Sequence, residues 1–148
     1  MTEPTIELIT GGSFTDARGK LQFFNDFDMI PVKRFYRIDH PDETVVRAWQ
    51  GHQFEQKWFY VIKGSFLVAI VQPEKWDQPS GKEVVQTFTL AASKQQILHI
   101  PGGYVNGFKA LEPDAAVIIF SNFNTQESEK DNYRFEKNSW FDWSKAYI

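Results

Sequence analysis

Short apolar segments with alternating side chains, each closed by turn residues, recur along this 148-residue chain and most constrain its fold. Since period-two alternation is the pattern of half-buried strands, about ten strands are predicted. Their expected ranges are 5–10, 20–24, 33–38, 45–49, 57–63, 65–72, 84–90, 96–100, 104–111 and 115–123. Clusters such as Gly11-Gly12 and Pro101-Gly102-Gly103 separate them, and Lys63-Gly64 can turn one strand straight into the next. With weak helical periodicity throughout, the pattern predicts an all-β sandwich or barrel.

The chain shows no break in composition, no repeat and no low-complexity tract, so residues 1–148 are predicted to form a single domain. Its length suits one sizeable core. The segment 124–148 is polar with aromatic residues near its end. We expect it to contain a helical turn and to act as a lid or a docking tail.

Composition excludes several classes of function. The formal net charge is −3 and no run of Lys or Arg exceeds two residues, which argues against nucleic-acid binding and against a polybasic membrane anchor. Cysteine is absent, so disulfides, thiolate nucleophiles and thiolate-bound zinc are excluded. The N-terminus lacks the features of a signal peptide, and the apolar run 66–71 is too short to span a bilayer. A cytoplasmic protein is expected.

The stretch RAWQGHQFEQKWFYVIKG, residues 47–64, resembles the first motif of the cupin family, and residues 101–106 resemble the second. The first motif has two His separated by one residue, then three or four residues, a Glu, six further residues and a Gly; the second is Pro-x-Gly-x-x-His. Alternate residues of one strand point inward, which lets such side chains meet at one metal. The resemblance implies an all-β cupin-type jelly roll, also called a double-stranded β-helix.

In this chain, three of the four metal-holding positions of that family carry other residues. Gln50 and His52 stand at the two His positions, Lys57 at the Glu and Asn106 at the last His. An ammonium repels a divalent cation. We therefore expect no metal and no other cofactor, which disfavours a metal-dependent dioxygenase.

Two interpretations of the His52 and Lys57 pair remain open from the residues alone. In the first, Lys57 extends to solvent at the barrel rim and His52 is a hydrogen-bonded core residue. In the second, the pair handles a carbonyl substrate: His52 removes the proton next to the carbonyl and Lys57 stabilises the enolate.

A narrower resemblance rests on four segments in order: FTDARGKLQFFND (14–26), residues 47–64, ILHIPGGYVNGFKAL (97–111) and IIFSNF (118–123). They are similar to the dTDP-4-dehydrorhamnose 3,5-epimerases and the dTDP-4-keto-6-deoxyhexose 3,4-ketoisomerases, which are metal-free cupins. The resemblance covers residues 6–135. It implies that Arg18 and Arg47 bind the nucleotide diphosphate and substrate, that Lys57 holds the enolate oxygen, and that His52 is catalytic.

Three positions depart from the epimerase pattern. Gln50 replaces the general base, Asn106 replaces a histidine, and Phe123 stands where a tyrosine acid is expected. Gln and Phe cannot exchange protons at neutral pH. These three are retained as substrate-binding residues, and a 3,4-ketoisomerase or single-centre epimerase is favoured over a 3,5-epimerase.

The resemblance thus implies a nucleotide-sugar isomerase or epimerase that acts on a dTDP-4-keto-6-deoxyhexose in deoxysugar and surface polysaccharide biosynthesis. It also implies a homodimer paired through N-terminal strands. The alternative is a cupin that has lost catalysis and binds a sugar nucleotide or another small polar ligand. Among the remaining histidines, His99 is expected to be structural and His40 to lie in an exposed turn.

Overall fold

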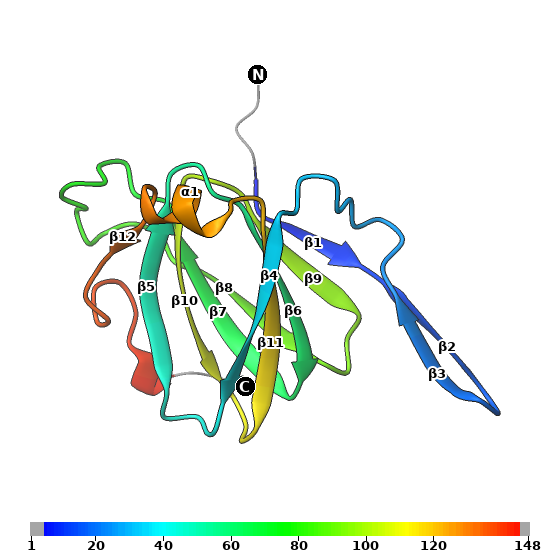
Figure 1. The fold of residues 1–148 in the computed structure, drawn as a ribbon. Coiled ribbons are helices and arrows are strands. Elements are labelled where there is room, and N and C mark those ends of the chain that lie inside the picture. The colour runs from blue at the N-terminus through cyan, green and yellow to red at the C-terminus, as the bar shows by residue number, and fades with distance from the viewer. Residues whose placement is uncertain (1–4, 146–148) are drawn as a thin grey trace.

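Two five-stranded antiparallel sheets pack face to face in a jelly roll in the computed structural model, which describes residues 5–145 (Figure 1). The first sheet has the order β1-β9-β6-β11-β4, with bounds Glu7–Thr10, Gln96–Ile100, Lys57–Lys63, Ala115–Ser121 and Arg34–His40. The second has the order β12-β5-β10-β7-β8, with bounds Tyr133–Arg134, Val46–His52, Tyr104–Ala110, Ser65–Val71 and Gln86–Ala91. The predicted all-β jelly roll is confirmed.

The core lies between the two sheets and follows from the alternation of each strand. Phe59, Leu98 and Ile119 from the first sheet meet Phe66 and Ile70 from the second, and all are buried. The β6–β7 turn is the predicted one, because Gly64 has φ +71°, a conformation that favours glycine. The ten predicted strands all form, with ends that differ by a few residues.

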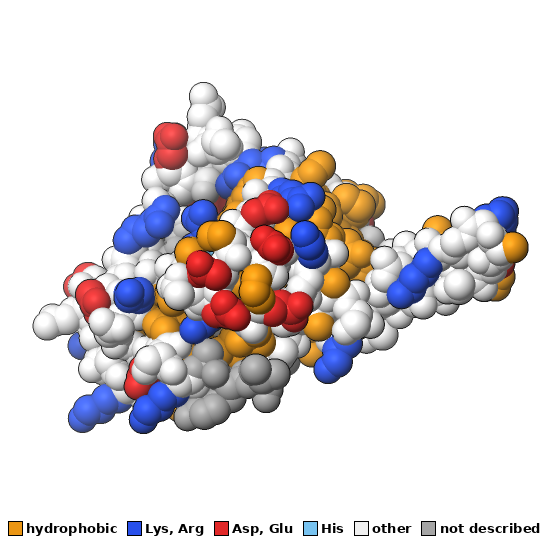
Figure 2. Space-filling model, turned by 90° about the horizontal axis from the view of Figure 1, so that it is seen from below, with side chains coloured by type: hydrophobic (Ala, Val, Ile, Leu, Met, Phe, Trp, Pro, Cys, Tyr) orange, Lys and Arg blue, Asp and Glu red, His pale blue; other side chains and the backbone are white. Residues whose placement is uncertain are grey.

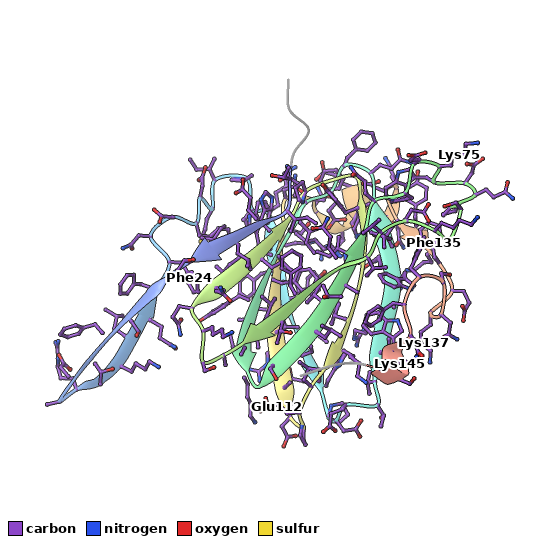
Figure 3. The ribbon with its side chains drawn as sticks, turned by 180° about the vertical axis from the view of Figure 1, so that it is seen from behind. Phe24, Lys75, Glu112, Phe135, Lys137 and Lys145 are labelled. Carbon is purple, nitrogen blue, oxygen red and sulfur yellow. The ribbon has the colours of Figure 1, made fainter. Side chains whose placement is uncertain are left out.

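Two strands, β2 (Gly12–Asp16) and β12, were not predicted. β2 pairs with the predicted strand β3 (Gly19–Phe23) in a hairpin, which we call the arm, although the sequence predicts a turn at Gly11-Gly12. Its strands pair with each other and with no other described strand. The arm projects away from the barrel in all three views, and Phe24 marks its base (Figures 1–3). Because neither strand of the arm pairs with another described strand, the arm needs no strong apolar pattern, which is why β2 was not predicted.

The C-terminal segment packs along its own barrel. The predicted helical turn is α1 (Thr125–Glu129), followed by β12, which pairs with β5, and a 3-10 helix at Trp143–Lys145. The carbonyl of Lys137, labelled in Figure 3, accepts hydrogen bonds from the indole N–H groups of Trp49 and Trp143 at 3.0 and 3.1 Å. The segment from β12 to the 3-10 helix is therefore docked on the second sheet, and α1 lies at one end of the barrel (Figure 1). Residues 146–148 of the predicted tail lie outside the described part. No helix in residues 5–145 is long and apolar enough to cross a membrane.

Candidate active site

A cavity of about 450 Å³ lies inside the barrel, reached by residues of β4, β5, β6, β10, β11, α1 and β12. Apolar side chains such as Phe59, Phe108 and Ile119 form part of its wall. Its polar and charged lining consists of Arg34, Tyr36, Arg47, Gln50, Lys57, Asn106, Ser128 and Arg134. A concave site with a few convergent polar groups on an apolar wall is typical of small-molecule binding.

The cavity is strongly cationic. Four of its lining residues are cations and none is an acid. Arg34 is partly neutralised by the buried Glu55, whose carboxylate lies 3.4 Å from its Nη2. Within residues 5–145, the guanidinium groups of Arg47 and Arg134 make no hydrogen bond or ion pair with the protein. Free guanidinium groups facing one cavity are suited to an anion such as a diphosphate.

Lys57 is a buried ammonium inside this cavity. Its residue is 5% exposed, and its Nζ donates a hydrogen bond to Gln50 Oε1 at 3.1 Å. Burial lowers the pKa of Lys57 to about 8, and Arg34 and Arg134 add to the effect while Glu55 opposes it. The side chain does not extend to solvent at the rim, which excludes the first interpretation for Lys57.

Tyr36 lies on the neighbouring side of the same cavity, with its ring centroid 5.8 Å from Lys57 Nζ. Burial raises the pKa of Tyr36 to about 12. Its phenol therefore stays protonated at neutral pH and can donate a hydrogen bond to a substrate oxygen.

His52 lies two residues beyond Gln50 on β5, so the strand places both on the same face. Its Nδ1–H donates to the backbone carbonyl of Asp131 at 2.7 Å, which leaves the lone pair of the neutral ring on Nε2. That Nε2 is buried and has no hydrogen-bond partner within residues 5–145. Burial, helped by the charge of Lys57, lowers the pKa of His52, so the ring is neutral and can accept a proton.

The carboxylate of Asp131 fixes the loop between His52 and Lys57. It accepts the backbone N–H groups of Gln53, Phe54 and Glu55 at 2.8, 2.9 and 2.7 Å. The same residue therefore orients the loop through its side chain and His52 through its carbonyl.

The structure brings most of the predicted site residues together. Arg47, Gln50, Lys57 and Asn106 line the cavity. His52 is not among the lining residues; it lies two residues beyond Gln50 on β5. Arg18 does not line the cavity of its own chain.

Arg18 sits at the tip of the arm, paired with Asp16 at 2.7 Å, and 87% of its side chain is exposed. Phe123 lies just beyond β11, and it is not among the lining residues. Its carbonyl accepts a hydrogen bond from Arg34 Nε at 2.9 Å, so it contacts the site through its backbone.

Arg34, Tyr36 and Arg134 are cavity residues that the sequence analysis missed. Arg34 and Tyr36 alternate within the predicted strand 33–38, so its period-two pattern could have placed them on one face. Arg134 lies in a polar segment with no strand signal, and its pairing with Gln50 appears only in the tertiary structure.

The prediction that His40 lies in an exposed turn is wrong. The residue ends β4, is 1% exposed, and its ring stacks on Phe108 and contacts Phe66 edge to face. Those rings come from β10 and β7, and their approach could not be read from the local turn residues around His40. His99 has the structural role expected of it. Its ring stacks on that of Trp58 with the ring centroids 4.6 Å apart, and its Nε2 lies 2.8 Å from Gln56 Oε1.

No cluster of three or more His, Asp or Glu side chains able to hold a metal occurs within residues 5–145. At the site itself, the amides of Gln50 and Asn106 and the ammonium of Lys57 stand beside His52. This set of side chains does not fit a divalent cation.

No family model matches the chain. One curated protein is similar: a probable low-salt glycan biosynthesis epimerase of Haloferax volcanii, 27% identical over 96 residues. The match covers 65% of this chain and 60% of that protein, so the chain spans less than two thirds of its length.

Several solved structures superpose well. A dTDP sugar isomerase from Desulfovibrio desulfuricans gives a TM-score of 0.75 at 17% identity, covering 95% of this chain and 92% of that one. The dTDP-4-dehydrorhamnose 3,5-epimerase of Bacillus anthracis, with TDP and pyrophosphate bound, gives 0.71 at 16% identity, covering 90% and 79%. A 3,4-ketoisomerase variant from Thermoanaerobacterium thermosaccharolyticum, bound to TDP-4-keto-6-deoxyglucose, gives 0.69 at 17% identity, covering 88% and 87%. The chain therefore has the jelly-roll fold of the dTDP-sugar epimerases and 3,4-ketoisomerases.

Proposed function

We propose that this protein is a nucleotide-sugar isomerase or epimerase. Its substrate would be a dTDP-4-keto-6-deoxyhexose, and its pathway deoxysugar and surface polysaccharide biosynthesis. The observation that carries the proposal is a cationic cavity holding a buried ammonium, Lys57, beside a neutral imidazole, His52, whose Nε2 is free. The Haloferax volcanii epimerase and the superposed sugar isomerases support the same class.

Binding would begin with the diphosphate. Arg47 and Arg134 have no hydrogen-bond or ion-pair partner among residues 5–145, and each can donate two hydrogen bonds to phosphate oxygens. Gln50 and Asn106 offer both donors and acceptors to sugar hydroxyls. Phe123 would contribute through its carbonyl, which holds Arg34 at the cavity wall.

The chemistry would be proton transfer next to the 4-keto group. His52 would take the proton at Nε2, and Lys57, still largely charged at neutral pH, would stabilise the enolate oxygen. The phenol of Tyr36 would donate a hydrogen bond to the same region of the substrate. One proton acceptor can invert a single centre, or carry a proton from C3 to the adjacent C4 through an enediol, but it does not serve the distant C3 and C5 on opposite faces. A 3,4-ketoisomerase or single-centre epimerase therefore fits better than a 3,5-epimerase.

The arm supports a homodimer as the working unit. It exposes apolar side chains at Phe14 (57%) and Leu21 (60%), although both belong to a paired hairpin. A second copy that covers the arm would bury them, and it would receive the exposed Arg18 near its own barrel. We include this dimer in the proposal. We also propose that the chain is a single cupin domain and that it works in the cytoplasm, because a chain without cysteine needs no disulfide and fits a reducing compartment.

Proton NMR of dTDP-4-keto-6-deoxyglucose in heavy water, with catalytic amounts of protein, tests the function. We expect deuterium to enter at C3, or at C4 of a 3-keto product, and not at C5. His52→Asn should abolish exchange, because Asn keeps hydrogen bonding but accepts no proton. His99→Asn is the matched control, since His99 lies on the outer side of β9 against Trp58, and exchange should persist.

The other outcomes are equally informative. Incorporation at both C3 and C5 would contradict the single acceptor and restore a 3,5-epimerase. Binding of the nucleotide sugar without any exchange would identify a cupin that has lost catalysis.

A further inference from the structure

Glu55 is a buried carboxylate that none of the sequence motifs explains. Its side chain has no exposed surface. The hydroxyl of Ser128 donates to Oε1 at 2.7 Å, and the hydroxyl of Ser121 donates to Oε2 at 2.6 Å. Arg34 adds a third donor at 3.4 Å. Burying a carboxylate is costly unless such partners compensate it, so the fold holds this group in place with several side chains.

The carboxylate lies against the imidazole of His52. Glu55 Oε1 is 3.3 Å from His52 Nδ1, while the Nδ1 proton is directed to the Asp131 carbonyl. When Nε2 takes up a proton, the ring becomes a cation and a negative charge already stands beside it. At this separation in a poorly solvated site, the attraction is large.

We propose that Glu55 is a positioning residue for His52: it stabilises the protonated ring and thereby makes Nε2 an effective proton acceptor. The effect of Glu55 on the reaction rests on the proposed function. Its effect on the proton affinity of the His52 ring does not.

Other groups around the ring set the balance. Burial and Lys57 disfavour the charged imidazole, whereas Glu55 and the carbonyl and carboxylate of Asp131 favour it. Glu55 also favours the charged form of Lys57, against the effects of Arg34 and Arg134. Replacing Glu55 by a neutral residue should therefore lower the proton affinity of both His52 and Lys57.

NMR titration of the ring nitrogens in the full chain tests this without a substrate. The chain has three histidines, so His40→Leu and His99→Asn assign the signals. In Glu55→Gln, we expect the pKa of His52 to fall by about one unit or more, a tenfold loss of proton affinity. The pKa values of His40 and His99 should not change.

Ser121→Ala is the matched control. It removes one hydrogen bond to Glu55 and keeps the charge. If Glu55 served only to pack the loop, Ser121→Ala and Glu55→Gln would both leave the His52 pKa unchanged and lower stability alike, which would overturn the proposal. If Glu55→Gln does not fold, the ring nitrogen signals of the parent protein still test the proposal. A proton on Nε2 of neutral His52, instead of on Nδ1, would contradict it.

Exchange of the nucleotide sugar separates this inference from the proposed function. If the parent exchanges deuterium, Glu55→Gln should move both limbs of its pH–rate profile to lower pH and slow the reaction, and Glu55→Asp should restore part of the rate. An unchanged profile would overturn the role of Glu55 while leaving the enzyme intact. If the parent shows no exchange but Glu55→Gln still lowers the His52 pKa, the proposed function fails and the Glu55–His52 pairing stands.

Discussion

Lys57 is the residue at which function and stability oppose each other most directly. Its ammonium is buried, surrounded by other cations, and bonded to a single amide oxygen. Its pKa drops from 10.5 to about 8, so protonation of the folded chain is less favourable than protonation of the unfolded chain. That difference amounts to about 3 kcal/mol at pH values below 8, as an order of magnitude.

Replacement of Lys57 by an apolar residue of similar length should therefore stabilise the protein. We expect Lys57→Met to raise the free energy of unfolding at pH 7 by about 1–3 kcal/mol, measured by urea denaturation, and to abolish deuterium exchange. Lys63→Met, at the exposed end of the same strand, is the control and should change stability little. A marked loss of stability in Lys57→Met would show that neighbouring groups such as Glu55 fully compensate the cost of burying the ammonium.

The same group sets the upper limit of the working pH range. Since Lys57 loses its charge as the pH rises through about 8, the exchange rate should fall there. Because burial lowers the pKa of His52, the lower limb should appear below the ordinary histidine value of 6.5. A pH profile of single-carbon exchange checks both limbs, and a rate that continues to rise above pH 9 would argue against a charged Lys57.

At the scale of elements, the loop between β5 and β6 is held by Asp131 from the segment after α1. Three consecutive backbone N–H groups depend on one carboxylate. Removal of the carboxylate would leave these donors without their partner. The N–H of Glu55 is buried and those of Gln53 and Phe54 are partly buried, and a fully buried unpaired donor costs about 1–3 kcal/mol.

Asp131→Ala should accordingly lower the free energy of unfolding by about 3 kcal/mol or more, measured by urea denaturation. Asp142→Ala is the matched control, because within residues 5–145 that exposed carboxylate accepts hydrogen bonds from Ser144 alone. Similar small effects of the two substitutions would mean that water replaces Asp131 in the loop.

The arm is the element whose exposed surface calls for a partner. Phe14→Lys combined with Leu21→Lys should convert a dimer to a monomer in analytical ultracentrifugation, because charge on both apolar positions opposes their burial. Val84→Lys, at an equally exposed apolar residue in the β7–β8 loop, should leave the assembly unchanged. A monomeric parent would remove the dimer from the proposal.

Considered as a whole molecule, the chain is predicted to be sensitive to mild acid. All three histidines are held in surroundings that lower their pKa, with burial as the leading cause. The unfolded chain therefore binds protons at higher pH than the folded chain, and stability present above pH 6.5 is lost as the pH falls below it.

His40 should contribute clearly, since both ring nitrogens are buried without partners within residues 5–145. We expect His40→Leu to flatten the loss of thermal stability between pH 7.5 and pH 5.5, as measured by calorimetry. His99→Asn should flatten it less, because its ring is partly exposed and hydrogen bonded. An unchanged slope in His40→Leu would contradict this reasoning.

Several features of this protein could be determined from sequence alone. Strand alternation and turn residues fixed the all-β class and ten of the twelve strands, because each depends on neighbours within a few residues. The resemblance to the cupin motifs implied that Gln50, Lys57 and Asn106 would share one site, and the structure brings them to one cavity from β5, β6 and β10.

Other features were decided only by the tertiary structure. Arg134 reaches the cavity because β12 pairs with β5, and Glu55 contacts His52 because Ser121 and Ser128 hold it from β11 and α1. His40 is buried because Phe66 and Phe108 enclose it from β7 and β10. Arg18 is kept away from the cavity by an arm that leaves the barrel. For Arg134, Glu55 and His40 the physical reason is the same: burial and charge depend on residues distant in sequence, whose approach no local pattern encodes.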